Sequence, residues 1–234
     1  MKQILCTIYF QYYDGSDGNV FFNDLENKDE ILLLFFIDKL VGFTTLKNYL
    51  IDCPDGFTPL NPYQNSNSLS ILFSGDTIVS AQHWGQQALA FAWIRHISVI
   101  KSRHAHLPLY WFLLVKGFRT YRYLFSFTKS FFPYWDDNRN DLKYLADYLA
   151  FQKYGALYNP LSGIVECPEK SGFLTEQWSS PKYKDLIHPS TQFFLQTNPN
   201  YQQGHELVCV CELEAVNFKP FTNRILEHSN AFSE

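Results

Sequence analysis

The stretch LSILFSGDTIVSAQHWGQQALAFAWIRHISVI, residues 69–100, decides the fold that the sequence predicts. It is apolar and strand-like from Leu69 to Phe73 and again from Thr77 to Ala81, on either side of the turn-forming Ser74-Gly75-Asp76. From Leu89 to Ile100 the apolar residues recur every three or four positions, which predicts an amphipathic helix. The segment therefore predicts strand structure that is followed at once by a helix.

The polar turn between this strand and this helix is a candidate anion site. The first N–H groups of a helix have no intrahelical partner, and the helix dipole is positive at that end. The pattern Gln82-x-x-Gly85-x-Gln87-Ala88 occupies the turn, and a side chain at position 85 would block the close approach of a phosphate. We therefore expect residues 82–88 to bind an anion, and a pyrophosphate best of all.

The remaining apolar runs predict one α+β domain over residues 1–234. We find no repeat and no low-complexity linker, and residues 159–190 are irregular. Further strands are expected at Ile4–Phe10, Ile31–Ile37, Leu40–Leu46, Leu109–Val115, Gln192–Leu195 and Glu206–Leu213. Further helices are expected at Phe118–Phe132, which Pro133 ends, and from Asp141 to a C-cap at Gly155, whereas Asp14–Asn19 is expected to be a turn.

The composition is that of an ordered globular protein. Hydrophobic residues make up 46% of the 234 residues and charged residues 18%, and the net charge of −4 disfavours non-specific binding to nucleic acid. The longest uncharged apolar run, Leu107–Val115, is too short for a bilayer, and Met1–Cys6 lacks the features of a secretory signal. The five cysteines lack the spacing of disulfide or zinc sites. We therefore expect a reduced, cytoplasmic, soluble protein without a metal site or a membrane span.

The order of these elements resembles the GCN5-related N-acetyltransferase (GNAT) superfamily, the acyl-CoA N-acyltransferase fold. The matching parts are a central hairpin (Ile31–Leu46), a strand and loop (Leu69–Ala88), a strand that splays away (Leu109–Val115) and a final hairpin in Phe193–Cys209. The resemblance covers about residues 30–135 and 190–214 and leaves a tail at 215–234. It implies a mixed, mostly antiparallel sheet flanked by helices. It also implies direct transfer of an acyl group from acyl-CoA to an amine in a ternary complex.

The resemblance also implies roles for individual residues. Asp76 is the candidate base, and Tyr121 or Tyr123 is the candidate acid that protonates the leaving thiolate. The acyl-CoA is expected to contact Ile78, Val79, Ser80, Gln82, His83, Trp84, Gly85, Gln86, Gln87, Ala88, Lys116 and Arg119. Simpler roles stay open, because Asp76 suits a turn, the two tyrosines suit a core, and Lys116 and Arg119 suit the surface.

Several further alternatives stay open. The 22 Phe, 15 Tyr and 5 Trp suit a roomy apolar cavity. The acyl donor is therefore expected to be acetyl-CoA or a longer acyl-CoA, and the aromatic content favours the longer acyl chain. A catalytically inactive GNAT-like module for ligand sensing or protein interaction is the alternative function. A third hypothesis, a groove for single-stranded nucleic acid at Arg119–Lys129, is opposed by the net charge. The expected partners are acyl-CoA and an amine-bearing acceptor, and a homodimer through an uncovered sheet edge is an open alternative.

Overall fold

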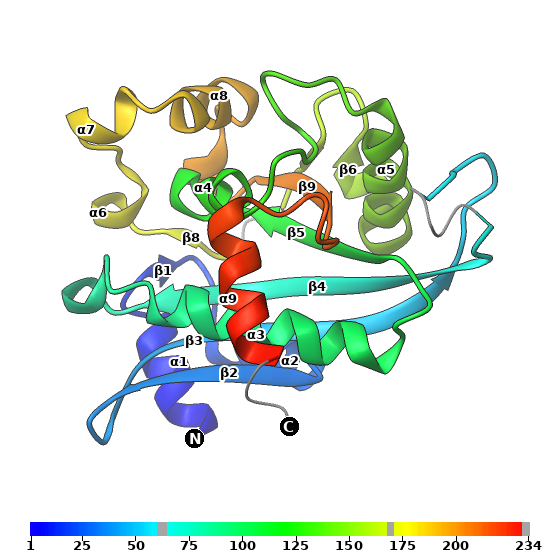
Figure 1. Ribbon diagram of the computed structural model, residues 1–234. Coiled ribbons are helices and arrows are strands. Elements are labelled where there is room, and N and C mark those ends of the chain that lie inside the picture. The colour runs from blue at the N-terminus through cyan, green and yellow to red at the C-terminus, as the bar shows by residue number, and fades with distance from the viewer. Residues whose placement is uncertain (60–64, 168–170, 231–234) are drawn as a thin grey trace.

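Seven strands form one mixed sheet in the computed structural model, which describes residues 1–59, 65–167 and 171–230 (Figure 1). In spatial order the strands are β2 (Glu30–Phe36), β3 (Lys39–Asp52), β4 (Ser68–Val79), β5 (Leu109–Val115), β9 (Glu206–Glu212), β7 (Ile164–Val165) and β6 (Tyr158–Asn159). Only β4 and β5 run parallel, and every other neighbouring pair in this sheet is antiparallel. The chain therefore has the α+β class and the mostly antiparallel sheet that were expected.

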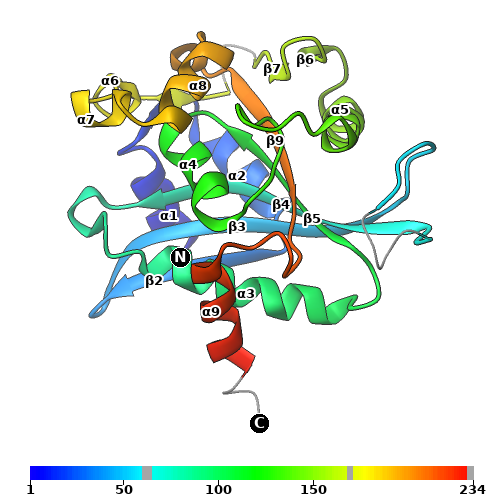
Figure 2. The same ribbon diagram turned by 45° about the horizontal axis from the view of Figure 1, so that its top comes forward.

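Helices cover both faces of this sheet. The front layer holds α3 (Ala88–Arg103), α4 (Phe118–Phe127), α8 (Pro189–Thr197) and α9 (Pro220–Asn230). The back layer holds α1 (Lys2–Tyr9), α2 (Gly18–Glu26) and α5 (Asn140–Tyr154). Figures 1 and 2 show α3 and α9 on the side of the sheet opposite α1 and α2. The sheet is thus the middle of three layers.

Short elements complete the structure. A two-stranded antiparallel sheet joins β1 (Tyr13–Asp14) to β8 (Phe173–Leu174). The short helices are α6 (Glu176–Ser179) and α7 (Tyr183–Leu186), and the single 3₁₀ turns are η1 (Ala81–His83), η2 (Gly155–Leu157) and η3 (Tyr201–Gln203). Among the described residues, we find no helix that combines the length and the apolar character needed to cross a membrane.

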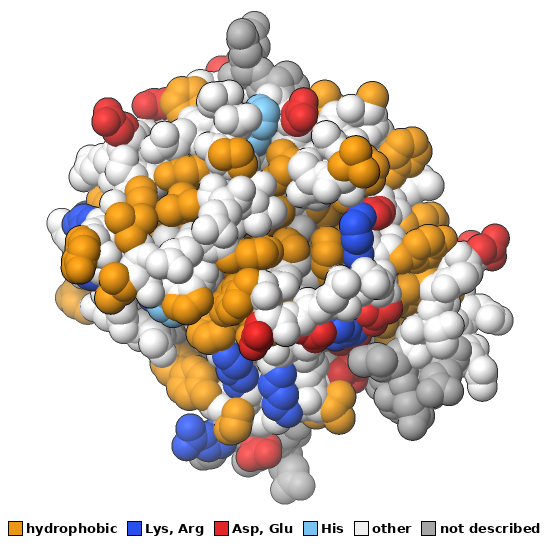
Figure 3. All heavy atoms as spheres, turned by 90° about the horizontal axis from the view of Figure 1, so that it is seen from above, with side chains coloured by type: hydrophobic (Ala, Val, Ile, Leu, Met, Phe, Trp, Pro, Cys, Tyr) orange, Lys and Arg blue, Asp and Glu red, His pale blue; other side chains and the backbone are white. Residues whose placement is uncertain are grey.

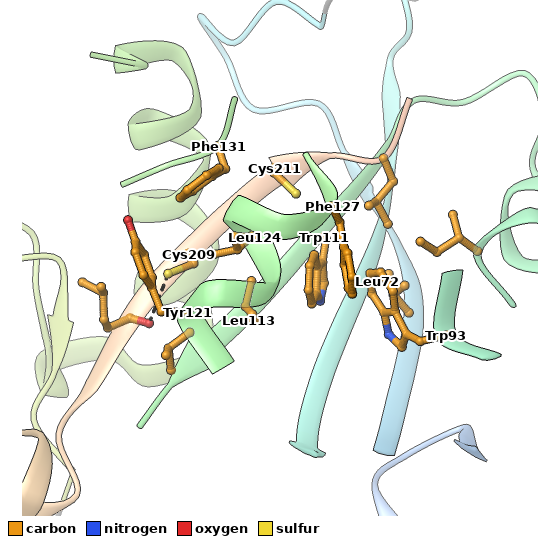
Figure 4. Packing of buried hydrophobic residues seen from close by; sticks show 14 of the residues in the cluster. Leu72, Trp93, Trp111, Leu113, Tyr121, Leu124, Phe127, Phe131, Cys209 and Cys211 are labelled. Atoms are coloured by element: carbon orange, nitrogen blue, oxygen red, sulfur yellow. Dashed lines mark hydrogen bonds between the residues drawn. The ribbon is translucent and has the colours of Figure 1, made fainter. Parts of the chain in front are cut away.

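The front core lies between the sheet and helices α3, α4 and α8. Trp93 of α3 packs on Trp111 of β5 with ring centroids 4.2 Å apart, and Phe127 of α4 stacks on the same Trp93 ring at 5.8 Å (Figure 4). The back of the sheet carries two separate cores. One packs α5 against β4, β5 and β9, and the other packs α1 and α2 against β3 and β4. A space therefore remains at the back of the sheet between these two cores.

Much of the predicted element order is confirmed. The hairpin of β2 and β3, the strand β5, and the helices α3 and α5 lie where they were expected, and Gly155 caps α5 with a φ of +54°. The helix expected at Phe118–Phe132 ends earlier, because Thr128 turns extended and forms an isolated β-bridge with Phe218.

Three expectations are wrong. Ile4–Phe10 is not a strand but lies mostly in α1, where Leu5, Ile8 and Tyr9 face the back core at helical spacing. The turn expected at Asp14–Asn19 ends at Asp17. Gly18 begins a second helix, α2, because the side chain of Asp17 accepts hydrogen bonds from the N–H groups of Asn19 and Val20.

The third correction concerns the end of the chain. Gln192–Leu195 lies in α8 and not in a strand, so β9 has no final hairpin partner there. Pro189 is at the first position of this helix, and the His188 ring accepts from the N–H of Ser190 at 3.3 Å. Phe194 is fully buried in the front core, and its ring centroid lies 6.0 Å from that of Tyr121.

Candidate functional site

The parallel strands β4 and β5 separate after Ser74 of β4 and Leu113 of β5. They are paired from Ser70 opposite Leu109 to Ser74 opposite Leu113, and no pairing is recorded between them beyond that point. The β5-facing edge of β4 from Gly75 to Val79 therefore has no strand beside it in the described structure. Backbone groups at such an opening are free to bind a ligand.

A β-bulge lies at the start of this opening. Ser74 pairs with Leu46 and Thr77 pairs with Thr44, so two residues of β4, Gly75 and Asp76, lie opposite a single residue of β3. The extra residue reverses the alternation of side chains along the strand. As a result, Thr77 faces the front and Asp76 faces the back. Ser74-Gly75-Asp76 is thus part of one continuous strand and is not a turn, which corrects the alternative role of Asp76.

The front of the opening is a groove with a volume of about 530 Å³. It lies between the end of β4, the turn before α3, and the first turns of α4. Three basic residues line it, Arg119, Arg122 and Lys184, and the described lining residues include no Asp or Glu. Arg122 lies 3.4 Å from the Asp185 carboxylate. Arg119 and Lys184 still leave a local excess of positive charge on a chain whose net charge is −4, so the groove suits an anionic ligand.

The turn before α3 strengthens this positive character. Gly85 has a φ of +87° and Gln87 a φ of +56°, and these two left-handed residues direct the chain into the helix. A Cβ atom added at Gly85 would meet no other atom within 4 Å, so the backbone is open to the groove. Ala88 begins α3, and the first N–H groups of that helix lie at the groove.

Aromatic and basic side chains form the wall opposite the helix. Trp84 donates its indole N–H to the carbonyl of Val79 at 2.6 Å, and the Arg119 guanidinium lies 5.2 Å from the centre of the Trp84 ring. Arg119 also donates to the carbonyl of Trp178, and Trp178 packs edge-on against Trp84. These contacts fix Arg119 at the mouth of the groove.

The back of the opening is a smaller cavity, with a volume of about 240 Å³. It occupies the space between the two back cores, between α1 and α2 on one side and α5 on the other. Its titratable residues are Asp24, Lys28, Asp76, Lys116, Cys167 and Glu206, together with Tyr9, Tyr13 and Tyr154. Thr77 and Thr120 line both this back cavity and the front groove, so the two spaces meet at the β4–β5 opening.

Asp76 has the most informative ionisation in the back cavity. The pKa of this carboxyl is raised from its ordinary value to about 6. Burial is the largest cause, the charges of Asp24 and Glu206 add to it, and Lys116 and Lys28 oppose it. Among the described residues, the Asp76 carboxylate forms no hydrogen bond or ion pair. A carboxylate with these properties is suited to accept a proton near neutral pH.

Lys116 lies in the back cavity and not in the front groove, which differs from its expected role on the coenzyme. Its ammonium group donates to the carbonyl of Ser171 at 2.9 Å and lies 3.5 Å from a Glu206 oxygen. Burial opposes its charge, but Glu206 and Asp76 outweigh burial and raise the pKa of Lys116 above its ordinary value. Lys116 therefore stays a cation in this cavity.

The two candidate tyrosines have different surroundings. Tyr121 is fully buried, and its hydroxyl donates to the carbonyl of Pro133 at 2.6 Å. Figure 4 shows it beside Phe131 and Cys209, at the opposite end of the front core from Trp93. Tyr123 instead lines the front groove and the adjoining apolar pocket, and burial raises its pKa above the ordinary value. Of the pair, the structure brings only Tyr123 to the opening.

The other expected coenzyme residues divide into two groups. Those that line the front groove are Ile78, Val79, His83, Trp84, Gly85, Gln87, Ala88 and Arg119. Ser80, Gln82 and Gln86 belong to the same turn but are not among its lining residues. The residues expected to bind coenzyme or to act in catalysis did not include Arg122, Lys184, Thr77 and Thr120 in the groove, or Asp24 and Lys28 in the back cavity. Of these, Thr120 and Arg122 lie in the Arg119–Lys129 segment that was considered for nucleic acid.

Within the part of the chain that the structure describes, no three His, Cys, Asp or Glu side chains are grouped so as to hold a metal ion. Comparison of the sequence with models of known protein families gave no match, and comparison with curated proteins gave none either.

Proposed function

We propose that this protein is an acyl-CoA-dependent N-acyltransferase of the GNAT type. The observation that carries the proposal is the separation of charge across the β4–β5 opening. The front groove has three basic side chains and a helix N-terminus, whereas the back cavity has three carboxylates and two lysines, and the two spaces meet at Thr77 and Thr120. An anionic donor on one side and a cationic amine on the other would meet at this point.

The front groove is proposed to hold the coenzyme. Its pyrophosphate would accept hydrogen bonds from the N–H groups at the start of α3, and Arg119, Arg122 and Lys184 would balance its charge. The pantetheine arm, which carries amide groups, would lie along the unpaired edge of β4 from Gly75 to Val79. The thioester would then reach the opening beside Thr77.

The transfer is proposed to proceed by direct attack. The amine enters from the back cavity and gives up a proton to Asp76, and its nitrogen then attacks the thioester carbonyl. The C–N bond forms and the C–S bond breaks, and Tyr123 donates a proton to the departing thiolate. After the attack the nitrogen loses a second proton, which replaces the one that Tyr123 gives, and Asp76 releases the first proton to solvent. An ammonium ion and a thioester thus become an amide, the free thiol and one proton. No covalent enzyme intermediate is required.

The space for the acyl group is small. An apolar pocket of about 30 Å³ lies at the opening between β4, β5 and helices α3 and α4, and its walls include Leu89, Trp93 and Trp111. A pocket of this size holds a short chain without movement of those side chains. We therefore propose acetyl-CoA or another short-chain acyl-CoA as the donor. The expectation of a longer acyl group stays a prediction, and this pocket does not support it.

Initial-rate kinetics test the proposal. Thiol release from acetyl-CoA is measured with a panel of primary amines, at several concentrations of each substrate. Direct attack predicts release that depends on the amine and double-reciprocal lines that intersect. Parallel lines would contradict direct attack, because they indicate an acyl-enzyme intermediate. A faster rate with octanoyl-CoA than with acetyl-CoA would contradict the short-chain donor.

One observation favours the alternative of a non-catalytic interaction module. Phe35, Phe36 and Ile37 are 49%, 53% and 82% exposed at the tip of the β2–β3 hairpin, and β2 is an edge strand. Such a surface suits a protein partner or a homodimer. Coenzyme binding without thiol release from any amine would favour this alternative over the enzyme. A cytoplasmic location stays a prediction.

A further inference from the structure

The back cavity has features that select among amines. Its walls combine five aromatic residues with three carboxylates and two lysines. We propose that it binds a small primary amine that has an aromatic ring and no carboxylate. This inference rests on the proposed acyl transfer for its functional meaning, but the binding can be measured separately.

The charges in the cavity favour a cation. Lys28 lies 2.5 Å from the Asp24 carboxylate, and Lys116 lies 3.5 Å from that of Glu206, so each lysine has an acidic partner. Asp76 is the carboxylate that remains, and among the described residues it has no hydrogen-bond or ion-pair partner. An ammonium group beside Asp76 would supply the missing counter-charge.

The aromatic walls favour a ring on the ligand. Tyr9 and Tyr13 stack with centroids 4.6 Å apart and planes inclined by 7°, and Phe21 lies 4.9 Å from the Tyr9 ring. Phe73 of β4 and Tyr154 of α5 line the same space. Aromatic surfaces pack well against an aromatic ligand. The ammonium groups of Lys28 and Lys153 already lie over the Phe73 ring, so these walls favour the ring of the ligand and Asp76 favours its ammonium group.

The size of the cavity favours a small molecule over a protein. Its volume of about 240 Å³ is below the roughly 300–1,000 Å³ of pockets for larger ligands. Its walls come from α1, β1 and α2 on one side and from α5 on the other, with β4 between them. A ligand of one ring and a short aminoalkyl chain fits this space. A lysine on a protein surface would need to bring its backbone close to these helices.

A carboxylate on the ligand would be unfavourable. It would add a negative charge to a space that already holds Asp24, Asp76 and Glu206, and both lysines have acidic partners there. Tyramine and tyrosine differ only by this carboxylate, so they form a matched pair of probes. We expect the protein to prefer tyramine by about tenfold or more, since a charge buried without a partner costs at least that much.

Calorimetric binding and initial rates with acetyl-CoA test this inference on the full chain. Tyramine, tyrosine and a lysine-containing peptide are each titrated into the protein, alone and with coenzyme A. The parent is expected to bind tyramine and to acetylate it faster than the other two. Asp76→Asn is expected to lose tyramine affinity about tenfold while keeping coenzyme affinity. Asp38→Asn, which removes an exposed carboxylate from the β2–β3 turn, serves as the control and should change neither.

The outcomes separate this inference from the proposed function. Equal use of tyramine and tyrosine, or acetylation of the peptide alone, would overturn the inference and leave the acyltransferase in place. Tyramine binding that Asp76→Asn weakens, in a protein that binds no coenzyme, would support the inference and overturn the acyltransferase. An Asp76→Asn variant that binds tyramine as the parent does would also overturn the inference, provided that its circular dichroism is unchanged.

Discussion

At the scale of single residues, Asp76 connects the ionisation of the site to its chemistry. Its carboxylate faces the back cavity only because the bulge of β4 reverses the side-chain alternation after Ser74. Burial raises its pKa to about 6, so most of it is ionised at neutral pH and still basic enough to take a proton. The sequence allowed two roles for Asp76, a turn residue or the general base. Because Asp76 lies within β4, the turn role is wrong and the role of base stays a prediction.

The pH dependence of acyl transfer should report this ionisation. We expect kcat/KM for the amine to fall as the pH drops below about 6, because Asp76 then takes up a proton and loses its basicity. Asp76→Asn should lower kcat/KM by about 100-fold or more at pH 7.5 and should lose this acid limb. An unchanged limb in the variant would show that another group is the base.

The same substitution should affect stability in a pH-dependent way. A folded-state pKa above the ordinary value means that ionising Asp76 costs folding free energy, and the cost is complete only above about pH 6. Asp76→Asn removes that cost. The variant should therefore gain stability over the parent at pH 8 but not at pH 4. The difference between its free energy of unfolding and that of the parent should be larger at pH 8 by about 2 kcal/mol, after allowance for solvent in the cavity. Urea denaturation at the two pH values measures the difference, and an equal effect at both would contradict the shifted pKa.

Tyr121 and Tyr123 offer a matched pair of Phe substitutions. Tyr123→Phe should lower kcat by about 100-fold, since it removes the proposed proton donor, with little loss of stability. Tyr121→Phe should destabilise the fold by about 1–2 kcal/mol, because it removes the hydrogen bond from the Tyr121 hydroxyl to the carbonyl of Pro133. Its rate per folded molecule should stay near that of the parent. Thermal unfolding and initial rates on both variants check this, and the reverse pattern would assign the donor to Tyr121.

At the scale of elements, the bulge of β4 at Gly75 and Asp76 positions the site, and it packs closely on β3. A Cβ atom added at Gly75 would lie 2.5 Å from the Thr45 hydroxyl oxygen and 2.6 Å from Cε of Lys28. The Lys28 side chain is 3% exposed and paired with Asp24, so it has little freedom to move away. The bulge therefore needs a residue without a side chain at this position.

Gly75→Ala should accordingly disturb both the fold and the back cavity. We expect a loss of about 1–3 kcal/mol in stability, from overpacking against Thr45 and Lys28, and a higher KM for the amine. Gly18→Ala is the control, because its Cβ would make only an ordinary contact with Phe22 at 3.7 Å. Chemical denaturation and amine kinetics measure both effects. Equal stability of the two variants would contradict the packing at the bulge.

Helices and strands with long, regular apolar patterns could be predicted from the sequence. Short apolar segments, which fit a helix and a strand alike, could not. The hairpin of β2 and β3 and the helix α3 have long, regular patterns, and both are confirmed. Ile4–Phe10 is short, and its apolar residues fit a strand and a helix almost equally well. Packing of Leu5 and Tyr9 against α2 and β3 decides for the helix. For Gln192–Leu195, Pro189 was an available helix-start signal.

The same contrast applies to the site. The front groove comes mainly from one continuous segment, so the pattern from Gln82 to Ala88 was enough to find its turn. The back cavity brings together Asp24, Asp76, Tyr154 and Glu206, which are far apart in the sequence. Only the packing of α2 and α5 on the same face of the sheet makes them neighbours, and no local pattern contains that information.

At the scale of the whole molecule, the distribution of charge matters more than the net charge of −4. Seen from the side of α5 and α8, the surface shows acidic, basic and apolar side chains among polar ones (Figure 3). The separation of charge on which the proposed function depends lies inside, between the basic front groove and the back cavity, where three carboxylates exceed two lysines. A polyanionic donor and a cationic acceptor can therefore approach the opening from opposite sides of the sheet.

The most direct test is a calorimetric titration with coenzyme A of the parent, Gly85→Glu and Gly56→Glu. Both glycines have a similar positive φ, +87° and +83°, and neither would place a Cβ atom within 4 Å of another atom, so the backbone strain is matched. Only Gly85 lines the front groove. The account predicts that the parent and Gly56→Glu bind coenzyme A, and that Gly85→Glu binds at least about tenfold more weakly, since a carboxylate would face the pyrophosphate. No binding by the parent, or equal binding by both variants, would contradict it.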